Sequence, residues 1–171
     1  LAVHALDVVL TDAPGADLPN VKVYSHLLGE SKMAIFGTPG LAAKYKPGFP
    51  RSLDQAPFLL PTHASSMRRT LEGWFDELGI RPRVVAEFDD SALLNAFGED
   101  GSGLFAAPSV IEPQIKRQYR LQKVGIARGI AERFYALTGE RRLKHPALVA
   151  LTEAAKRDLF QKRSERAQRE S

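Results

Sequence analysis

The sequence predicts an α/β fold, because short apolar runs alternate with helical patterns through the middle of the chain. The alternation covers residues 57–79, 83–98 and 103–118, and each of these segments shows an apolar strand, a polar turn and a helix in that order. A parallel sheet with crossover helices requires this order. We therefore expect ligands at the carboxyl ends of the strands, where such sheets bind them.

The clearest of these segments is 57–79. Residues 58–60 form an apolar strand that Pro61 must end, because proline has no N–H for the sheet ladder. After the polar turn 62–66, apolar residues recur on one helix face, and Gly79 predicts a left-handed stop; Ser65 or Ser66 is the expected N-cap. The apolar residues of this face are Met67, Leu71, Trp74, Phe75 and Leu78. The turn thus joins hydroxyl groups to the positive end of a helix.

The flanking regions predict further strands and two further helical segments. The loop after the first strand contains Asp12, which is either a pocket residue or a turn residue before Pro14. The helical patterns are one turn at 41–45 and a last helix that begins at Pro146. Segment 21–28 is either an edge strand or a surface connection, and the other expected strands are 6–10, 31–36, 121–127 and 133–137.

Composition places this chain of 171 residues among globular proteins, with 44% hydrophobic and 26% charged residues. No apolar run is long enough to cross a membrane. The chain has no cysteine, so it holds no disulfide or thiolate metal site, and we expect a cytoplasmic protein. The sequence begins without methionine or a signal peptide and inside an apolar pattern, which predicts a fragment of something longer.

The positive net charge of +4 is concentrated at the C-terminus. Residues 156–171 hold six basic and three acidic residues, so the tail carries +3 and the other 155 residues only +1. A solvated, fraying helix end is favoured over a DNA-contacting tail. We therefore expect no specific DNA binding by this chain alone.

Four strand ends form the predicted binding site. No G-x-S-x-G elbow, no paired histidines with metal-ligand spacing and no glycine-rich loop between a strand and a helix is present, so we expect no enzyme, no cofactor and no zinc site. A small polar ligand needs none of these. The candidate residues are Thr11, Asp12, Thr62, His63, Ser65, Ser66, Phe88, Asp89, Ala107 and Pro108.

Five segments of the chain carry a family resemblance. They are LDVVLTDAP (6–14), SKMAIFGTP (31–39), FLLPTHASSMRRTLEGWFDELGI (58–80), RVVAEFDDSALLNAFGEDGSGLFAAP (83–108) and HPALVALTEAAKRDLF (145–160). Together they resemble the effector-binding domain of LysR-type transcriptional regulators. The resemblance implies two Rossmann-like lobes of the type 2 periplasmic-binding-protein kind, joined by two crossing strands, with an effector in the cleft between them. The first lobe would combine 1–37 and 130–171 and be truncated at its N-terminus, and the second would be 38–129.

The resemblance also implies partners. Promoter DNA would be bound only through an N-terminal helix-turn-helix outside this sequence, and the full-length protein would be a homodimer or tetramer. Within the family, the sequence resembles that of a sodium-responsive activator. Because hard cations prefer oxygen ligands, Asp12 and Asp89 are candidate sodium ligands. Two alternatives share the fold: a solute-binding protein of a transport system, and a dimerisation module without an effector.

Overall fold

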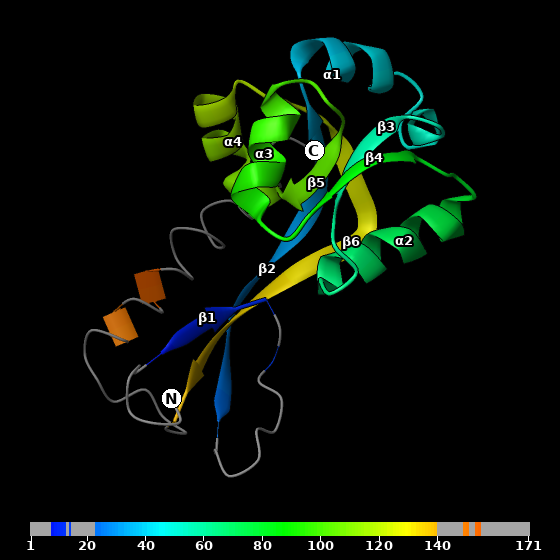
Figure 1. Cartoon of the computed structure of the whole chain (residues 1–171). Coiled ribbons are helices and arrows are strands. Elements are labelled where there is room, and N and C mark those ends of the chain that lie inside the picture. The colour runs from blue at the N-terminus through cyan, green and yellow to red at the C-terminus, as the bar shows by residue number, and fades with distance from the viewer. Residues whose placement is uncertain (1–7, 13, 15–22, 140–148, 151–152, 155–171) are drawn as a thin grey trace. The chain divides into compact units, whose positions relative to one another are not determined.

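The computed structural model describes residues 8–12, 14, 23–139, 149–150 and 153–154 (Figure 1). The chain divides into two compact units. One combines Leu1–Ser31 with Glu132–Ser171, and the other is Lys32–Ala131. Strands β2 (Tyr24–Gly37) and β6 (Gln122–Thr138) contribute residues to both units.

The unit Lys32–Ala131 contains all the alternating strands and helices predicted from the sequence. Its two parallel strands, β3 (Pro57–Pro61) and β4 (Arg83–Phe88), pair with one register shift between Phe58 and Leu59 and stay paired to their ends, where Pro61 lies opposite Phe88. The chain therefore leaves both strands at the same edge of the sheet, the edge at their carboxyl ends. The elements are α1 (Pro39–Tyr45), β3 (Pro57–Pro61), α2 (Ser66–Leu78), β4 (Arg83–Phe88), α3 (Ser91–Glu99), β5 (Phe105–Pro108) and α4 (Glu112–Tyr119), with single 3₁₀ turns at Arg51–Leu53 and Ser109–Ile111.

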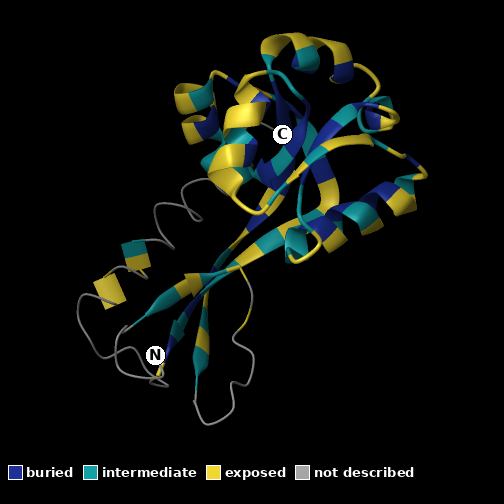
Figure 2. Cartoon of the chain, in the orientation of Figure 1, coloured by how far each residue is buried: buried dark blue, intermediate teal, exposed yellow. Residues whose placement is uncertain are grey.

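Helix α2 begins and ends where the sequence predicts. Ser65 is the N-cap, and its side chain accepts a hydrogen bond from the N–H of Met67 at 3.2 Å. Gly79 adopts a left-handed conformation with a φ of 66° and ends the helix. The predicted apolar face is buried at Leu71, Trp74 and Phe75, which pack in the core of this unit (Figure 2). The prediction for this segment is confirmed.

Two predictions about strands are wrong. Strand β2 (Tyr24–Gly37) runs unbroken from the described part of 21–28 through 31–36, and β6 (Gln122–Thr138) runs unbroken through 122–127 and 133–137. Residues 21 and 22 lie outside the described residues. Both strands are inner members of the four-stranded sheet β1-β6-β2-β5, and sheet context overrides the local preferences that suggested the breaks. Gly129 in β6 has a positive φ of 89°, and a long strand tolerates such a local irregularity.

Strand β5 departs from the parallel arrangement predicted for its region. It pairs antiparallel with β2, with Met33 opposite Pro108 and Phe36 opposite Phe105. Only Leu104, just before β5, bridges Phe58 of β3 in a parallel direction. The four-stranded sheet has the order β1-β6-β2-β5, and β3 and β4 form a second sheet.

The unit that includes both chain ends is described in part. Strand β1 (Val9–Thr11) pairs antiparallel with β6, with Thr11 opposite Tyr135. Residues 6 and 7 of the first predicted strand lie outside the described residues. Most of the predicted last helix also lies outside them, and its described residues 149–150 and 153–154 are helical.

Candidate functional site

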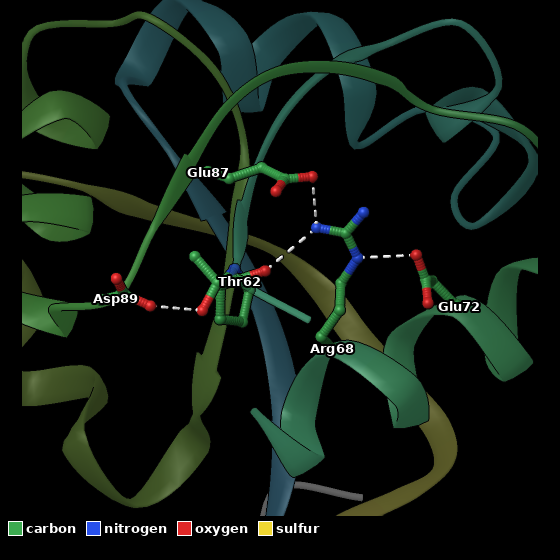
Figure 3. A network of polar contacts seen from close by, with 6 residues as sticks. Thr62, Arg68, Glu72, Glu87 and Asp89 are labelled. Atoms are coloured by element: carbon green, nitrogen blue, oxygen red, sulfur yellow. Dashed lines mark hydrogen bonds and ion pairs between the residues drawn. The ribbon is translucent and has the colours of Figure 1, made fainter. Parts of the chain in front are cut away.

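The ends of β3 and β4 bring two predicted site residues into direct contact. The hydroxyl of Thr62 donates a hydrogen bond to Oδ1 of Asp89 at 2.5 Å (Figure 3). The backbone N–H of Thr62 donates to the carbonyl of Phe88 at 3.0 Å, which continues the pairing of the two strands by one residue. Because the two parallel strands end side by side, with Pro61 opposite Phe88, the residues that follow them meet at one point although they are 27 positions apart. We call this point, with Thr62, Ser65, Asp89 and Asp90, the strand-end site.

Two helices begin at the strand-end site. Ser65 caps α2, and Asp90 caps α3 by accepting hydrogen bonds from the N–H groups of Ala92 at 2.7 Å and Leu93 at 2.9 Å. Each cap satisfies backbone groups that would otherwise lack partners inside the helix. Residues 89–91, Asp-Asp-Ser, are all residue types that cap helices, and Asp90 is the one that caps α3.

The charges of the strand-end site favour a ligand with a positive or hydrogen-donating group. Asp89 and Asp90 contribute a formal charge of −2. Each helix N-terminus contributes about +0.5, so two of them offset about half of that charge. The Thr62 hydroxyl adds a neutral oxygen beside Asp89. A sodium ion or a cationic or hydroxylated small molecule matches this set of oxygens better than an anion does.

A buried arginine beneath the site was not predicted. Arg68 is 5% exposed, and its guanidinium contacts Glu72 at 2.6 Å and Glu87 at 2.8 Å (Figure 3). It also donates to the carbonyl of Pro61 at 3.0 Å, immediately before Thr62. Burial acts to lower the pKa of Arg68, but the hydrogen bonds and charges of Glu72 and Glu87 outweigh burial and raise it. Arg68 thereby connects α2, β3 and β4 behind the strand-end site.

The sequence did contain a signal for Arg68. It lies three residues before Leu71 and seven before Phe75, which places it on the buried face of α2. An arginine on such a face needs carboxylate or carbonyl partners. Glu72 lies four residues later on the same helix, at the spacing that permits an ion pair.

The other predicted residues of this unit have varied surroundings. His63 is exposed, and the carbonyl of Ser66 accepts a hydrogen bond from the side chain of Thr70 at 3.1 Å. The ring of Phe88 packs against Phe97 with 5.0 Å between centroids. Ala107 and Pro108 pair with β2 at the end of β5. The shared role of these residues in binding stays a prediction.

Thr11 and Asp12 belong to the other unit, where the hydroxyl of Thr11 donates to Asp12 at 3.5 Å. The same unit contains Glu132 on β6, a carboxylate that the sequence did not single out. Burial, and secondarily the negative charge of Asp12, raise the pKa of Glu132 to about 7. The ring Nε2 of His26 shares a hydrogen bond with the hydroxyl of Thr138 at 2.9 Å.

Within the described part of the chain, no group of three or more histidine or acidic residues is arranged to hold a metal ion. None of the described helices has the length and apolar character that crossing a membrane would require.

Comparison with known proteins defines the family. The model of the LysR substrate binding domain matches residues 1–159, so the chain belongs to this family. The predicted fold class and the predicted family are thereby confirmed. Regulators of this type bind promoter DNA and oligomerise, and their effectors bind in this domain.

Particular relatives agree with this assignment. The chain is 28% identical over 148 residues to the transcriptional activator protein NhaR of Escherichia coli K12, and equally to that of Shigella flexneri. The alignment covers 86% of this chain and 48% of the relatives, so the chain spans about half of their length. The sequence strings LTDAP (10–14) and THASSMRR (62–69) carry the resemblance to NhaR.

Solved structures of similar fold are regulatory domains too. The effector domain of AmpR of Pseudomonas aeruginosa has a TM-score of 0.65 at 19% identity, covering 92% of this chain and 75% of that chain. The regulatory domain of CcmR of Synechocystis, in complex with 2-PG, has a TM-score of 0.64 at 11% identity, covering 93% and 76%. Identities this low establish the fold alone.

Proposed function

We propose that this chain is the effector-sensing regulatory domain of a LysR-type transcriptional activator of the NhaR kind. In the full-length protein it passes the state of its effector site to an N-terminal helix-turn-helix that binds promoter DNA. The observation that carries the proposal is the strand-end site, where Thr62 and Asp89 meet between two helix N-termini. The relatives named above are regulators, so the transport alternative gains no support from them.

The proposed effector is a small polar molecule or a sodium ion. The resemblance to NhaR motivates sodium. The strand-end site motivates it independently, because two carboxylates and a hydroxyl leave a negative balance after the helix dipoles are counted. A cation binds nearer to Asp89 than to Ser65, since the N-terminus of α2 repels positive charge.

The test uses the full-length regulator in a reporter strain. Sodium is titrated against potassium at constant ionic strength, and activation of the promoter is measured for the wild type, Thr62→Val, Asp89→Asn and Asp12→Asn. Asp76→Asn serves as the matched control, because Asp76 is an exposed aspartate of α2 away from the strand-end site. Constant ionic strength removes general screening as an explanation.

We expect Thr62→Val and Asp89→Asn to require at least about tenfold more sodium for half-maximal activation, while Asp76→Asn behaves like the wild type. An equal response of the wild type to sodium and potassium would exclude ion-specific sensing and leave a small molecule as the effector. An unchanged sodium dependence in Thr62→Val and Asp89→Asn would exclude the strand-end site. Asp12→Asn decides separately whether the other unit takes part in the response.

A further inference from the structure

The buried guanidinium of Arg68 joins the ends of the two strands that lead into the strand-end site (Figure 3). Its Nη1 donates one hydrogen bond to the carbonyl of Pro61 at 3.0 Å and another to Oε1 of Glu87 at 2.8 Å. Pro61 ends β3 and immediately precedes Thr62. Glu87 lies near the end of β4, two residues before Asp89. One nitrogen atom therefore links both strands directly behind the contact between Thr62 and Asp89.

The pairing of the two strands gains from such a link. Strands β3 and β4 form a two-stranded parallel sheet, and their register shifts between Phe58 and Leu59. Parallel pairing is slightly less stable per residue than antiparallel pairing. A slip of the register by one residue would turn the side chains that follow to the other face of the sheet. A link between the strand ends therefore helps to keep Thr62 beside Asp89.

The guanidinium is itself held in one orientation. Its Nε donates to Oε1 of Glu72, four residues later on α2, at 2.6 Å, and Arg68 is only 5% exposed. A guanidinium is planar and has donors in fixed directions, whereas the ammonium group of lysine is a point charge on a flexible stem. Arg68 therefore holds α2, β3 and β4 in a geometry that a lysine of the same charge does not reproduce.

We propose that Arg68 is a positioning residue of the strand-end site, which sets the distance between the Thr62 hydroxyl and the Asp89 carboxylate that the effector meets. This inference rests on the proposed function, because it concerns the same site. Arg68 acts through Pro61 and Glu87, since its own side chain is buried. Groups that orient the ligands of a metal ion typically contribute about 10- to 100-fold in affinity. Loss of the Arg68 links therefore weakens sodium binding without removing an oxygen ligand.

The test makes two measurements on the 171-residue chain by NMR. The first follows amide chemical shifts while sodium chloride replaces potassium chloride at constant ionic strength, and it gives the sodium concentration at half-saturation. The second is made without sodium and measures hydrogen exchange of the Thr62 amide, which donates to the carbonyl of Phe88 at 3.0 Å across the strand ends. The second measurement therefore reports on the strand ends whether or not an effector binds.

The variants remove the links singly and conservatively. Arg68→Lys keeps the charge and loses the planar group, Glu87→Ala removes one acceptor, and Glu87→Gln keeps an oxygen acceptor in its place. The control is Leu71→Ala, because Leu71 is buried on the same helix and its side chain has no polar group to link the strands. Circular dichroism shows which variants are folded.

We expect Arg68→Lys and Glu87→Ala to raise the half-saturating sodium concentration by about tenfold, while Glu87→Gln and Leu71→Ala stay within about twofold of the wild type. The Thr62 amide should exchange at least about tenfold faster in Arg68→Lys and Glu87→Ala than in Leu71→Ala, because the control destabilises the fold without removing the links. Unchanged sodium affinity in Arg68→Lys and Glu87→Ala overturns the proposal. So does an equal loss of affinity in Leu71→Ala, because reduced stability alone would then explain the effect.

The failure of the proposed effector looks different. A wild type without sodium-dependent shifts at the strand-end site contradicts sodium as the effector, and Thr62 exchange then decides the role of Arg68. Faster exchange in Arg68→Lys and Glu87→Ala than in Leu71→Ala supports the positioning role, and equal exchange in all three overturns it. If Arg68→Lys does not fold, the comparison of Glu87→Ala with Glu87→Gln decides.

Discussion

Helices α2 and α3 differ on their outer faces although they are built alike. Each follows one of two paired parallel strands, and each is capped by a side chain at the strand-end site. The outer face of α2 carries Arg69, Asp76 and Glu77, whereas that of α3 carries Leu93 and Phe97. A polar outer face such as that of α2 is suited to contact with water. An exposed apolar face such as that of α3 is typical of an interaction surface.

The inner faces differ as well. Helix α2 buries large side chains and one charged network around Arg68. Helix α3 approaches its neighbour through Gly98, where an added Cβ would lie 2.5 Å from the ring of Phe105. The packing of α3 therefore depends on the close approach of its backbone at Gly98 to Phe105. The packing of α2 depends on apolar side chains together with the ion pairs of Arg68. The following variants test this contrast.

The largest effect is expected at Arg68. Arg68→Met keeps the apolar stem but removes both ion pairs and the hydrogen bond to Pro61, leaving Glu87 and Glu72 without their cation. We expect a loss of about 2–4 kcal/mol in the free energy of unfolding, less than for a fully buried pair because both glutamates are partly exposed. Urea unfolding measures it. Arg69→Met is the control, since Arg69 is the exposed neighbour, and should stay within about 0.5 kcal/mol of the wild type.

The same substitution should have opposite signs in the two helices. Gly98→Ala forces α3 away from the buried ring of Phe105 and should cost about 1–3 kcal/mol. Gly73→Ala on the outer face of α2 meets nothing within 4 Å and should stabilise the protein by about 0.5–1 kcal/mol. Thermal unfolding of both variants gives the comparison. Equal effects would show that helix propensity, not close packing, governs both positions.

The buried charge of Arg68 is neutralised by carboxylates, whereas Glu132, in the other unit, is partly buried near the negative charge of Asp12. The pKa of Glu132 is therefore raised from 4.5 to about 7. The stability that Glu132 contributes is present below about pH 4.5 and is lost as the pH rises through 7. We expect Glu132→Gln to remove about 1–2 kcal/mol of this pH dependence, after a discount for partial exposure. Urea unfolding at several pH values measures it. Glu77→Gln, an exposed change on α2, should keep the wild-type profile.

The smallest difference in the free energy of unfolding is expected between variants of the two N-cap residues, Ser65 of α2 and Asp90 of α3. Asp90→Ala removes an acceptor of two hydrogen bonds at α3, and Ser65→Ala removes an acceptor of one at α2. We expect a cost of about 1 kcal/mol for each, with the larger cost at Asp90. Asp90→Asn should restore most of the loss, because an amide oxygen also caps a helix. A larger cost for Ser65→Ala would contradict the assignment of the caps.

The sequence predicted what depends on local pattern. Helix α2 with Ser65 and Gly79, the strand and helix of segment 83–98, and the family all follow from apolar periodicity, helix- and strand-breaking residues and recognisable sequence strings. The sequence did not predict that β2 and β6 run unbroken. These strands are stabilised by neighbouring strands that are distant in sequence, and the local signal of Gly129 suggested a break. The partners of Arg68 and the raised pKa of Glu132 likewise depend on such contacts, with Glu87 and Asp12 respectively.

The site was predicted at the level of strand ends. Thr62 and Asp89 were both named from their positions after apolar strands, and the register of β3 and β4 brings them into contact. The choice of Asp90 rather than Asp89 as the cap of α3 was left open by the sequence, because either residue fits the cluster. Since Asp90 is the cap, the carboxylate of Asp89 faces Thr62 instead.

The most direct measurement of the central claim is an amide chemical-shift map of the 171-residue chain by NMR. Sodium chloride replaces potassium chloride at constant ionic strength, for the wild type and for Asp89→Asn. We predict shifts concentrated at Thr62, Ser65, Asp89 and Asp90 in the wild type and their loss in Asp89→Asn, because sodium binds at the strand-end site. Shifts elsewhere in the chain, or the same shifts in Asp89→Asn, would contradict sodium binding at this site.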